Sequence, residues 1–417
     1  RGDGGEDRGR DRGDAEGKER VDKCGWARGG KWCQGSGDGG CKAGAKAKNA
    51  SRIAAMGGDM VECETRGGAK TLLKACGSSL IEGRQTGMDY DVSNLAAVNF
   101  NSTFAGIETA DAILIVGSHI RWEAPLVNVR IRKAVKRGAQ VFVVGSFWDT
   151  TYPAHFLGDE LSVLGDVPQE IADVFAQAEW PAIIMGGAAL AKGALGAGLA
   201  FADRFGLVKD GWNGFNVLHF SAARMGGLML GFAQQGGMAD IAQAKPKVVI
   251  SLGADEMDFE PYADSLKVYI GHHGDKGAHA ADIILPGASY AEKDGTYVNT
   301  EGRVQFAEKA VFAPGDARED WTILRALADA LKVEVGFDSF AELQAAMVRE
   351  VPALGEEGLA AYGDLPKADA DAQAEGTISG YPIQDFYLTN PIARASAVMQ
   401  QCSSELLGGG ELAEAAE

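Results

Sequence analysis

The chain has 417 residues, of which 46% are hydrophobic and 24% are charged. This is the composition of a globular protein long enough for two or three domains. The net charge of −18 disfavours nucleic acid or an anionic membrane as a partner, because both need concentrated Lys and Arg, and it favours either a role in solubility or a basic docking partner. No run of about 18 apolar residues is present, so we predict no direct membrane insertion.

Residues 1–46 are rich in Gly, Asp, Arg and Lys and poor in large apolar side chains. Such a tract buries too little surface to offset its ordering entropy, so we predict that it is disordered or artefactual. An RG-rich arm that binds nucleic acid is the alternative, but acidic residues nearly cancel the basic ones. The chain begins at Arg1 without an apolar signal segment, so we expect it to be processed or, as we prefer, incomplete at that end.

The six cysteines do not follow a metal-binding pattern. Cys24, Cys33 and Cys41 are nine and eight positions apart, without a C-x-x-C pair, so they support no particular iron-sulfur or zinc site. Free thiols in a disordered tract are the preferred interpretation. The remaining three lie in apolar segments and are expected to be buried small hydrophobes: Cys63, Cys76 and Cys402.

From residue 47 onward, short apolar runs that end in glycine recur along the chain. Continuous apolarity without alternation is typical of parallel strands covered on both faces. The runs span 52–59, 112–118, 140–146, 181–187, 247–255, 267–271 and 281–287. We therefore predict an α/β fold over 47–335, with two Rossmann-like parallel-sheet halves and a seam between Gly145 and Pro181.

Helical periodicity separates several of these runs. Residues 123–137 should form a helix that Gly138 closes, with basic residues near its negative end. Asp316 and Glu319 have the spacing of an acidic capping box before another helix. Residues 65–69 contain an Arg and two glycines, which disfavour a packed helix, and we suspect a sequence fault upstream or a divergent terminus.

Residues 336–417 form an acidic carboxy-terminal extension that is predicted to be irregular in its middle. It should wrap a partner or pack loosely. Asn390 and Pro391 are an N-cap and a first helical residue, so the extension is expected to end in a terminal helix. Its apolar stripe needs a surface to bury against and consists of Ile392, Ala395, Met399, Cys402 and Leu406.

Ligands of open parallel sheets bind beyond the carboxyl ends of the strands. The candidate loops are therefore Gly117-Ser118-His119, Gly145-Ser146, Gly186-Gly187 and Gly253-Ala254-Asp255. None reads G-x-G-x-x-G or G-x-x-x-x-G-K-[ST], and a glycine after a strand also serves a tight turn. A phosphate site is thus the weaker alternative to a simple turn.

Two further groups of polar residues are candidate sites. His272 and His273 should point apart in an extended segment, so loop hydrogen bonding is preferred to a metal site. A polar cradle is possible after the last strand, formed by Glu292, Asn299, Glu301 and Arg303. We assign no catalytic, cofactor-binding or metal-binding residue to this chain.

Residues 282–303, continuing to 314–321, resemble the signature of the molybdopterin oxidoreductase superfamily. Within it, the chain resembles the large iron-sulfur subunit of the respiratory NADH:quinone oxidoreductase, complex I, in its alphaproteobacterial and mitochondrial form. That resemblance runs from about Asn49 to Ser404 and rests on residues 101–108, 123–126, 271–275 and 385–396.

The resemblance implies a subunit of the peripheral arm, which takes part in electron transfer from NADH to quinone coupled to proton translocation. It implies that the 2Fe-2S and 4Fe-4S clusters bind in an upstream region that this sequence does not contain. This part would then be a cofactor-free scaffold that contacts other peripheral-arm subunits. It would lie on the cytoplasmic side of the bacterial inner membrane, or on the matrix side of the mitochondrial one.

Two alternatives stay open. The first is a molybdopterin-dependent oxidoreductase of the formate dehydrogenase type, in which the glycine loops would hold the phosphates of the cofactor. Residues 119–121 read His-Ile-Arg where active relatives have Asn-Pro, and no Cys or Ser stands out as a metal ligand, which disfavours it. The second is an unrelated nucleotide-binding protein, which should lack the motif at 385–396.

Overall fold

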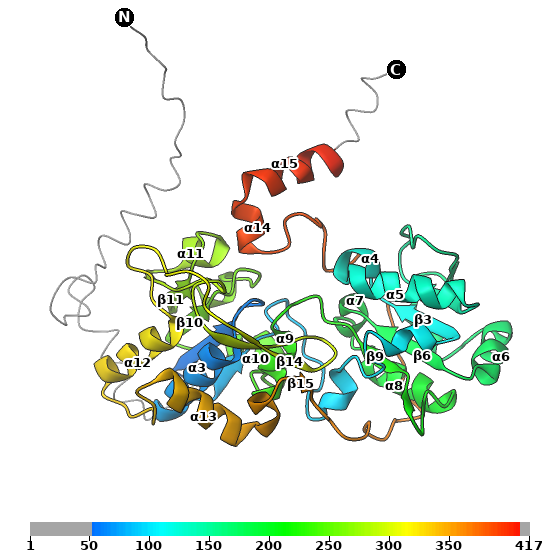
Figure 1. Cartoon of the computed structure of the whole chain (residues 1–417), viewed down its shortest axis with the longest axis horizontal. Coiled ribbons are helices and arrows are strands. Elements are labelled where there is room, and N and C mark those ends of the chain that lie inside the picture. Colours follow the sequence, from blue (N-terminus) through cyan, green and yellow to red (C-terminus); the bar gives the residue numbers. More distant parts are fainter. Residues whose placement is uncertain (1–51, 409–417) are drawn as a thin grey trace, which may run out of the picture.

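The computed structural model describes residues 52–408, so the predictions for residues 1–46 and for Cys24, Cys33 and Cys41 lie outside the described part. Figure 1 shows two lobes side by side, each built around a five-stranded parallel sheet. The first sheet has the order β12 (Ile283–Pro286), β11 (Leu266–Gly271), β10 (Val248–Leu252), β1 (Ile53–Gly57) and β2 (Leu80–Glu82). The second has the order β5 (His155–Phe156), β4 (Gln140–Val144), β3 (Ala112–Val116), β6 (Pro181–Met185) and β9 (Phe215–Val217). The prediction of two parallel-sheet halves is confirmed.

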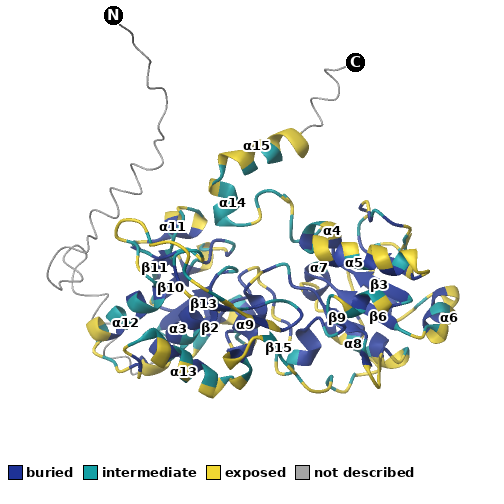
Figure 2. Cartoon of the chain, viewed as in Figure 1, coloured by how far each residue is buried: buried dark blue, intermediate teal, exposed yellow. Residues whose placement is uncertain are grey.

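All seven predicted apolar runs are strands of these two sheets. Every residue of β1, β3 and β6 is buried, as expected for strands covered on both faces (Figure 2). The predicted seam between Gly145 and Pro181 is wrong, because β4 and β6 both flank β3. The chain leaves the first lobe after β2, completes the second sheet, and returns to add β10, β11 and β12.

Helices cover both faces of each sheet. On the first sheet, α3 (Cys63–Ala75), α12 (Asp320–Leu331) and α13 (Phe340–Glu350) supply the larger apolar cluster, and α10 (Gly237–Gln243) packs on the opposite face. On the second sheet, one face carries α5 (Pro125–Lys136), and the other carries α6 (Gln169–Gln177) and α8 (Leu195–Arg204).

The remaining elements connect the two lobes or lie at their edges. Short helices are α4 (Ile120–Glu123), α7 (Gly187–Leu190), α9 (Arg224–Met229) and α11 (Lys276–Ala280). Single 3-10 turns are η1 (Leu95–Val98), η2 (Gly106–Thr109), η3 (Leu161–Leu164), η4 (Glu260–Tyr262) and η5 (Pro352–Gly355). An antiparallel ribbon pairs β13 (Gly295–Val298) with β14 (Arg303–Ala307), which is joined by β15 (Gly358–Leu359), and β7 (Val208–Lys209) pairs with β8 (Trp212–Asn213).

The helix expected at 123–137 is present as α5, which is shorter at its start because Ala124 separates it from α4, and Gly138 follows α5 with a φ of 108°. This positive φ is a conformation that only glycine adopts without strain, so the predicted closing glycine is confirmed. The predicted capping box is wrong. The helix α12 begins after Glu319, which makes no side-chain cap, and the hydroxyl of Thr322 instead donates to the carbonyl of Glu319 at 2.7 Å.

The expectation that residues 65–69 disfavour a packed helix is also wrong, because α3 runs through them with Arg66 fully buried. The Nη2 of Arg66 donates to the carbonyl of Gly58 at 2.5 Å, and its guanidinium lies 5.8 Å from the ring centroid of Phe232. A Cβ on Gly227 would come within 1.8 Å of the Nη1 of Arg66. Glycine on a neighbouring helix therefore makes room for the arginine.

The carboxy-terminal extension is irregular between β15 and the two terminal helices, α14 (Pro391–Ala395) and α15 (Ala397–Leu406). The Asn390 side chain accepts from the amide of Ala393 at 3.0 Å, which confirms the predicted cap. Ser396 then interrupts the helix and caps α15. Within the described chain, no residue of either terminal helix is fully buried, and residues 52–408 cover the predicted apolar stripe only in part: Ile392, Met399 and Cys402 are half-buried, whereas Ala395 and Leu406 are exposed.

Candidate functional site

The four glycine loops lie at the carboxyl ends of the strands, as predicted, but the structure divides them between the two sheets. The loops after β3, β4 and β6 gather at the edge of the second sheet, whereas the loop 253–255 follows β10 in the first sheet. Each edge is therefore a separate candidate for a ligand.

The glycines of the second sheet are required by contacts of the chain with itself. A Cβ on Gly117 would lie 2.4 Å from the amide nitrogen of Ala189, and one on Gly186 would lie 2.4 Å from the carbonyl oxygen of Gly117. Gly117 also has a φ of 63°. Close approach between the turns after β3 and β6 accounts for these glycines without a ligand.

A carboxylate of the chain takes the donors that a phosphate would need in the loop 117–119. Glu123 accepts from the amide of His119 at 2.8 Å and from the hydroxyl of Ser118 at 3.0 Å. Burial raises the pKa of Glu123 to about 7. An anionic ligand at this loop would compete with this carboxyl group for the same donors.

The His119 ring is held in an aromatic stack. Its centroid lies 4.7 Å from both Trp122 and Trp148, and Tyr381 packs against it edge-on. Burial lowers the pKa of His119, so the ring is favoured in its neutral form. These contacts hold the half-buried histidine ring in place against two tryptophans and a tyrosine.

The carboxy-terminal extension covers the edge of the second sheet. Ser146 donates to the carbonyl of Ile378 at 2.9 Å, and the hydroxyl of Tyr381 donates to the carbonyl of Ser146. A Cβ on Gly145 would lie 2.7 Å from the Tyr381 hydroxyl, and one on Gly187 would lie 2.8 Å from the ring of Pro382. Residues 378–382 thus occupy the space in front of these loops.

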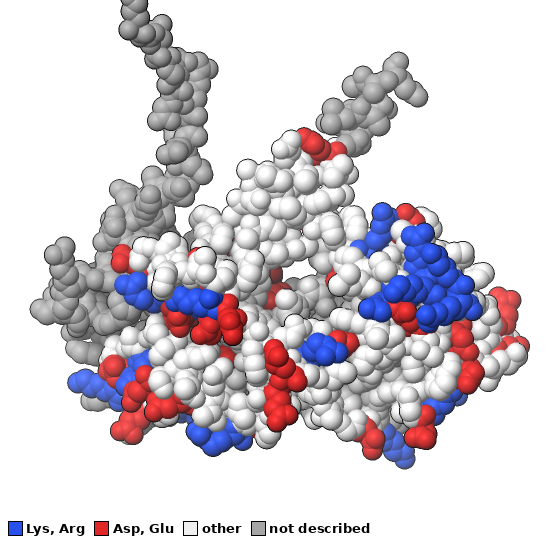
Figure 3. Space-filling model, viewed as in Figure 1, with Lys and Arg blue, Asp and Glu red and all other residues white. Residues whose placement is uncertain are grey.

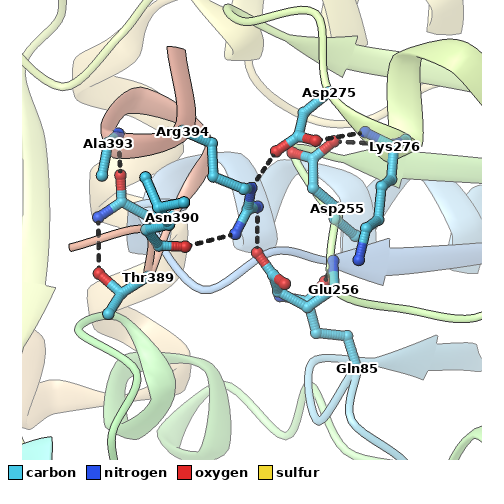
Figure 4. A network of polar contacts seen from close by, with 12 residues as sticks. Gln85, Asp255, Glu256, Asp275, Lys276, Thr389, Asn390, Ala393 and Arg394 are labelled. Carbon is cyan, nitrogen blue, oxygen red and sulfur yellow. Dashed lines mark hydrogen bonds and ion pairs between the residues drawn. The ribbon is translucent and has the colours of Figure 1, made fainter. Parts of the chain in front are cut away.

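The edge of the first sheet is closed by the segment that leads into α14. Figure 4 shows Arg394 pointing toward two carboxylates, with its Nε 2.5 Å from Asp275 and its Nη2 paired with Glu256. Arg394 also donates to the carbonyl of Leu388 at 3.1 Å. This arginine joins α14 to the loops after β10 and β11.

The cavity that remains at this edge has a volume of about 40 Å³. It is lined by residues of both the loops and the extension, among them Asp59, Glu256, His272, Lys293 and Asn390. Since one water needs roughly 10–15 Å³ and small-molecule pockets measure roughly 300 Å³ or more, the cavity has room only for a few waters.

Asp255 of the loop after β10 is bound within the protein. Its carboxylate accepts from the amide of Gly277 and from the hydroxyl of Tyr269, both at 2.9 Å. Burial raises the pKa of Asp255 to about 6. At both edges, a carboxylate of the chain itself thus accepts hydrogen bonds from loop donors that an anionic ligand would otherwise use.

His272 and His273 do not point apart, contrary to our expectation. Their Nδ1 atoms lie 2.6 Å apart and the rings meet edge-to-face, because the chain bends after β11 and is not extended. Burial and the neighbouring His273 lower the pKa of His272 to about 4. Over residues 52–408, no group of three or more His, Cys, Asp or Glu side chains could hold a metal ion.

The proposed polar cradle forms only in part. Asn299 accepts from the amide of Arg303 at 2.9 Å, and Arg303 pairs with Glu301 at 3.0 Å, in the turn between β13 and β14. Glu292 instead accepts from the amide of Ser289 at 2.8 Å, in its own turn. Glu301 also accepts from the amide of Phe104 at 2.8 Å, so the group fixes the ribbon to the second lobe.

The structure contains a buried cluster of charged side chains that the sequence analysis did not predict. Lys293 pairs with Glu62 at 2.7 Å and with Asp320, so that it joins the N-cap of α3, the turn before the ribbon and the first residue of α12. These ion pairs raise the pKa of Lys293 even though burial opposes its charge. Nothing local in the sequence indicates this cluster, because Lys293 lies more than 200 positions from Glu62.

The three described cysteines are free thiols. Cys63 and Cys76 are buried, as predicted, and burial raises the pKa of both, whereas Cys402 is half-buried on α15. None of the helices in the described part is both long and apolar enough to cross a membrane.

Comparison with known proteins gives two family matches. Residues 41–330 match the family described as molybdopterin oxidoreductase. Residues 357–402 match the family described as the C-terminal part of the G subunit of NADH-ubiquinone oxidoreductase. The resemblance seen in the sequence is therefore confirmed over both the sheet-bearing region and the extension.

Curated relatives carry the same description. The chain is 40% identical to the mitochondrial NADH-ubiquinone oxidoreductase 78 kDa subunit of Neurospora crassa over 322 residues, which cover 73% of this chain and 43% of that protein. It is 34% identical to the G subunit of the NADH-quinone oxidoreductase of Rickettsia typhi over 366 residues, covering 86% and 53%. The chain thus spans about half the length of these relatives.

Among solved structures, a chain of the formyltransferase/hydrolase complex from Methylorubrum extorquens matches with a TM-score of 0.48 and 15% identity. The match covers 67% of this chain and 92% of that one.

Proposed function

Because the chain belongs to the molybdopterin oxidoreductase family, we propose that it is part of the large iron-sulfur subunit of an NADH:quinone oxidoreductase and carries no cofactor of its own. Its two lobes form a scaffold in the peripheral arm. Electrons pass from NADH to quinone through groups outside this chain, including the 2Fe-2S and 4Fe-4S clusters of an upstream region, and their passage is coupled to proton translocation.

The observation that carries this proposal is the path of residues 378–394 across the carboxyl edges of both sheets. Ile378 and Tyr381 are hydrogen-bonded to Ser146 in the loop after β4 of the second sheet. Arg394 forms ion pairs with the loops after β10 and β11 of the first sheet. These are the positions where an α/β sheet binds a ligand. A chain that covers both edges with its own residues is suited to support and not to cofactor chemistry.

The partners of this scaffold are other peripheral-arm subunits, and the chain lies beside the membrane on the cytoplasmic side in a bacterium, or on the matrix side in a mitochondrion. The relatives are named as subunits, which supports an assembly. The extension matches a region described for the G subunit itself, which favours this assembly over other members of the family.

A molybdopterin-dependent oxidoreductase of the formate dehydrogenase type is the second candidate. The family match over residues 41–330 is compatible with it, whereas the match over 357–402 is described for the G subunit of NADH-ubiquinone oxidoreductase and favours the first candidate. Its phosphates would have to displace Glu123 from the donors of Ser118 and His119.

Metal analysis of the purified 417-residue chain separates the two candidates. Plasma mass spectrometry should find less than about 0.1 mol of molybdenum, tungsten or iron per mol of protein, and the visible spectrum should be featureless. Molybdenum or tungsten near 1 mol per mol would overturn the scaffold proposal in favour of the oxidoreductase. Stoichiometric iron would place a cluster within this chain and would contradict the upstream assignment.

A further inference from the structure

A basic surface lies on α5 in a chain whose net charge is −18. Residues 121–137 contain six Lys and Arg against one acidic residue, Glu123, which is buried. Figure 3 shows the basic side chains gathered over α4 and α5, on one side of the second lobe. The sign of this surface is opposite to that of the molecule.

Internal ion pairs neutralise only part of this surface. Glu108 is shared by Arg130, Lys133 and Arg137, at 3.0 Å from Lys133 and 3.6 Å from Arg137, and Arg121 pairs with Asp149 at 2.7 Å. Across residues 52–408, neither Arg132 nor Lys136 forms an ion pair, and both are exposed on α5. The positive charge of the helix thus exceeds what the chain supplies to balance it.

Two large apolar side chains are exposed on the same helix. Leu126 is 75% exposed and Val129 is 51% exposed. Together with Lys133 and Lys136 they follow the spacing 3, 4, 3, which aligns them along one line of the helix surface over ~15 Å. The opposite face of α5 is packed on the second sheet through Val127, Ile131 and Ala134.

This combination distinguishes the surface from an ordinary solvated helix face. Single exposed apolar side chains are common on solvated surfaces, but here a leucine and a valine are adjacent and in line with the charges, and protein interfaces combine an apolar centre with charged positions at the rim in this way. An anionic membrane would also attract the charges, but the apolar content is limited to two side chains on a helix otherwise fixed in the fold.

We propose that the line Leu126, Val129, Lys133 and Lys136, with Arg132 beside it, is the docking surface for an acidic protein surface of a neighbouring subunit. The partner places apolar side chains against Leu126 and Val129, near the amino end of α5. Its carboxylates lie opposite Arg132, Lys133 and Lys136, near the carboxyl end. The proposal deepens the scaffold function and rests on it, because it requires an assembly.

The contact can be tested first by zero-length carbodiimide cross-linking, which joins a lysine amine to a carboxylate in direct contact. In the intact oxidoreductase of the organism that makes this chain, Lys133 or Lys136 should be linked to an Asp or Glu of another subunit. Links from these lysines only to residues of this chain, such as Glu108, would overturn the proposal.

The second test measures the affinity of the purified 417-residue chain for the purified remaining subunits of that oxidoreductase. The double variant Arg132→Glu with Lys136→Glu should bind at least ~10-fold more weakly at low salt, because like charges would then face each other, and the difference should shrink as salt is added. Leu126→Asp should weaken binding at both low and high salt.

The matched control is Lys74→Glu with Lys192→Glu, which changes the same number of charges at exposed positions elsewhere. Lys74 lies in the last turn of its helix, as Lys136 does, so effects on helix stability are comparable. This control should bind as the unaltered chain does. Urea unfolding of each variant confirms that it is folded before affinities are compared.

Two outcomes separate this proposal from the proposed function. If the unaltered chain binds the other subunits and the double variant binds them equally well, the docking surface is wrong and the scaffold function stands. If the unaltered chain does not bind them at all, both are wrong. A third outcome concerns membranes. If the unaltered chain binds vesicles containing anionic phospholipid, and the double variant loses this binding while its affinity for the subunits is unchanged, the surface binds a membrane and the protein partner is overturned.

Discussion

Two carboxyl groups of the chain lie at the loops that follow the carboxyl ends of the strands, which is where parallel α/β sheets bind ligands. Glu123 takes the donors of the loop after β3, and Asp255 accepts two hydrogen bonds in the loop after β10. Burial raises the pKa of each, to about 7 and about 6. A carboxyl group whose pKa is raised toward 7 accepts the hydrogen bonds of the loop while it carries less than a full negative charge in the core.

This arrangement predicts a pH dependence of stability. Since the pKa of Glu123 rises from 4.5 in the unfolded chain to about 7 in the fold, the folded protein binds more protons between these values. The contribution of the Glu123 carboxyl group to the free energy of unfolding is therefore full below about pH 4.5 and declines as the pH rises to 7. Urea unfolding at pH 5.0 and 7.5 should show that Glu123→Gln removes part of this decline, up to about 3 kcal/mol.

The exposed residue Glu170 on α6 offers a charge-matched control. The variant Glu170→Gln should keep the decline seen in the unaltered chain. An equal decline in Glu123→Gln and the unaltered chain would mean that Glu123 is already ionised in the fold. The loop after β3 would then hold a full negative charge, contrary to the raised pKa of this carboxyl group.

At the scale of an element, the terminal helices are attached to the body by polar contacts. Arg394 pairs with Glu256 and Asp275, and all three side chains are between 17% and 25% exposed. No residue of α14 or α15 is buried, so apolar packing contributes little to holding these helices. The attachment of α14 therefore depends mainly on one arginine.

Replacing Arg394 by Gln should release the terminal helices without unfolding the lobes. Two partly solvated charged contacts contribute about 1–2 kcal/mol, which corresponds to roughly 10-fold faster opening. Hydrogen–deuterium exchange should accelerate by about that factor over residues 388–406, while the strands of both sheets stay protected. Arg349→Gln, at an exposed position of α13, is the control and should leave this exchange unchanged. Unchanged protection of α14 in Arg394→Gln would contradict the attachment.

At the scale of the whole molecule, part of the extension packs into the core of the second lobe. Ile378 is 1% exposed, and a Cβ on Gly117 would lie 2.9 Å from its Cδ1 atom. The amide of Ile378 donates to the carbonyl of Asp159 at 2.8 Å. Residues that follow the first lobe in sequence thus complete the second lobe.

Ile378→Ala should consequently lower the free energy of unfolding by about 2–4 kcal/mol, because it removes buried apolar groups and leaves a cavity. Leu359→Ala is the comparison, since Leu359 lies in the same extension but is 47% exposed, and it should cost less than about 1 kcal/mol. Urea unfolding measures both. A loss in Ile378→Ala no larger than that in Leu359→Ala would mean that the extension lies on the lobe without stabilising it.

The sequence by itself determined the features that depend on neighbours along the chain. The apolar runs predicted seven strands, Gly138 predicted the end of α5, and Asn390 predicted the start of α14, because strand burial and helix caps are encoded within a few residues. The fold class and the family resemblance follow from the same local patterns and motifs.

Only the tertiary structure decided which strands share a sheet. The boundary between the two sheets differs from the predicted one, because no local sequence pattern shows that the chain returns from the second sheet to the first between β9 and β10. The tertiary structure also decided that Arg66 is buried, since the space comes from Gly227, 161 positions away. The closure of both ligand edges depends on Tyr381 meeting Ser146 and Arg394 meeting Glu256. Such pairings are set by how whole elements pack, and packing between distant segments is not written in the spacing of either one.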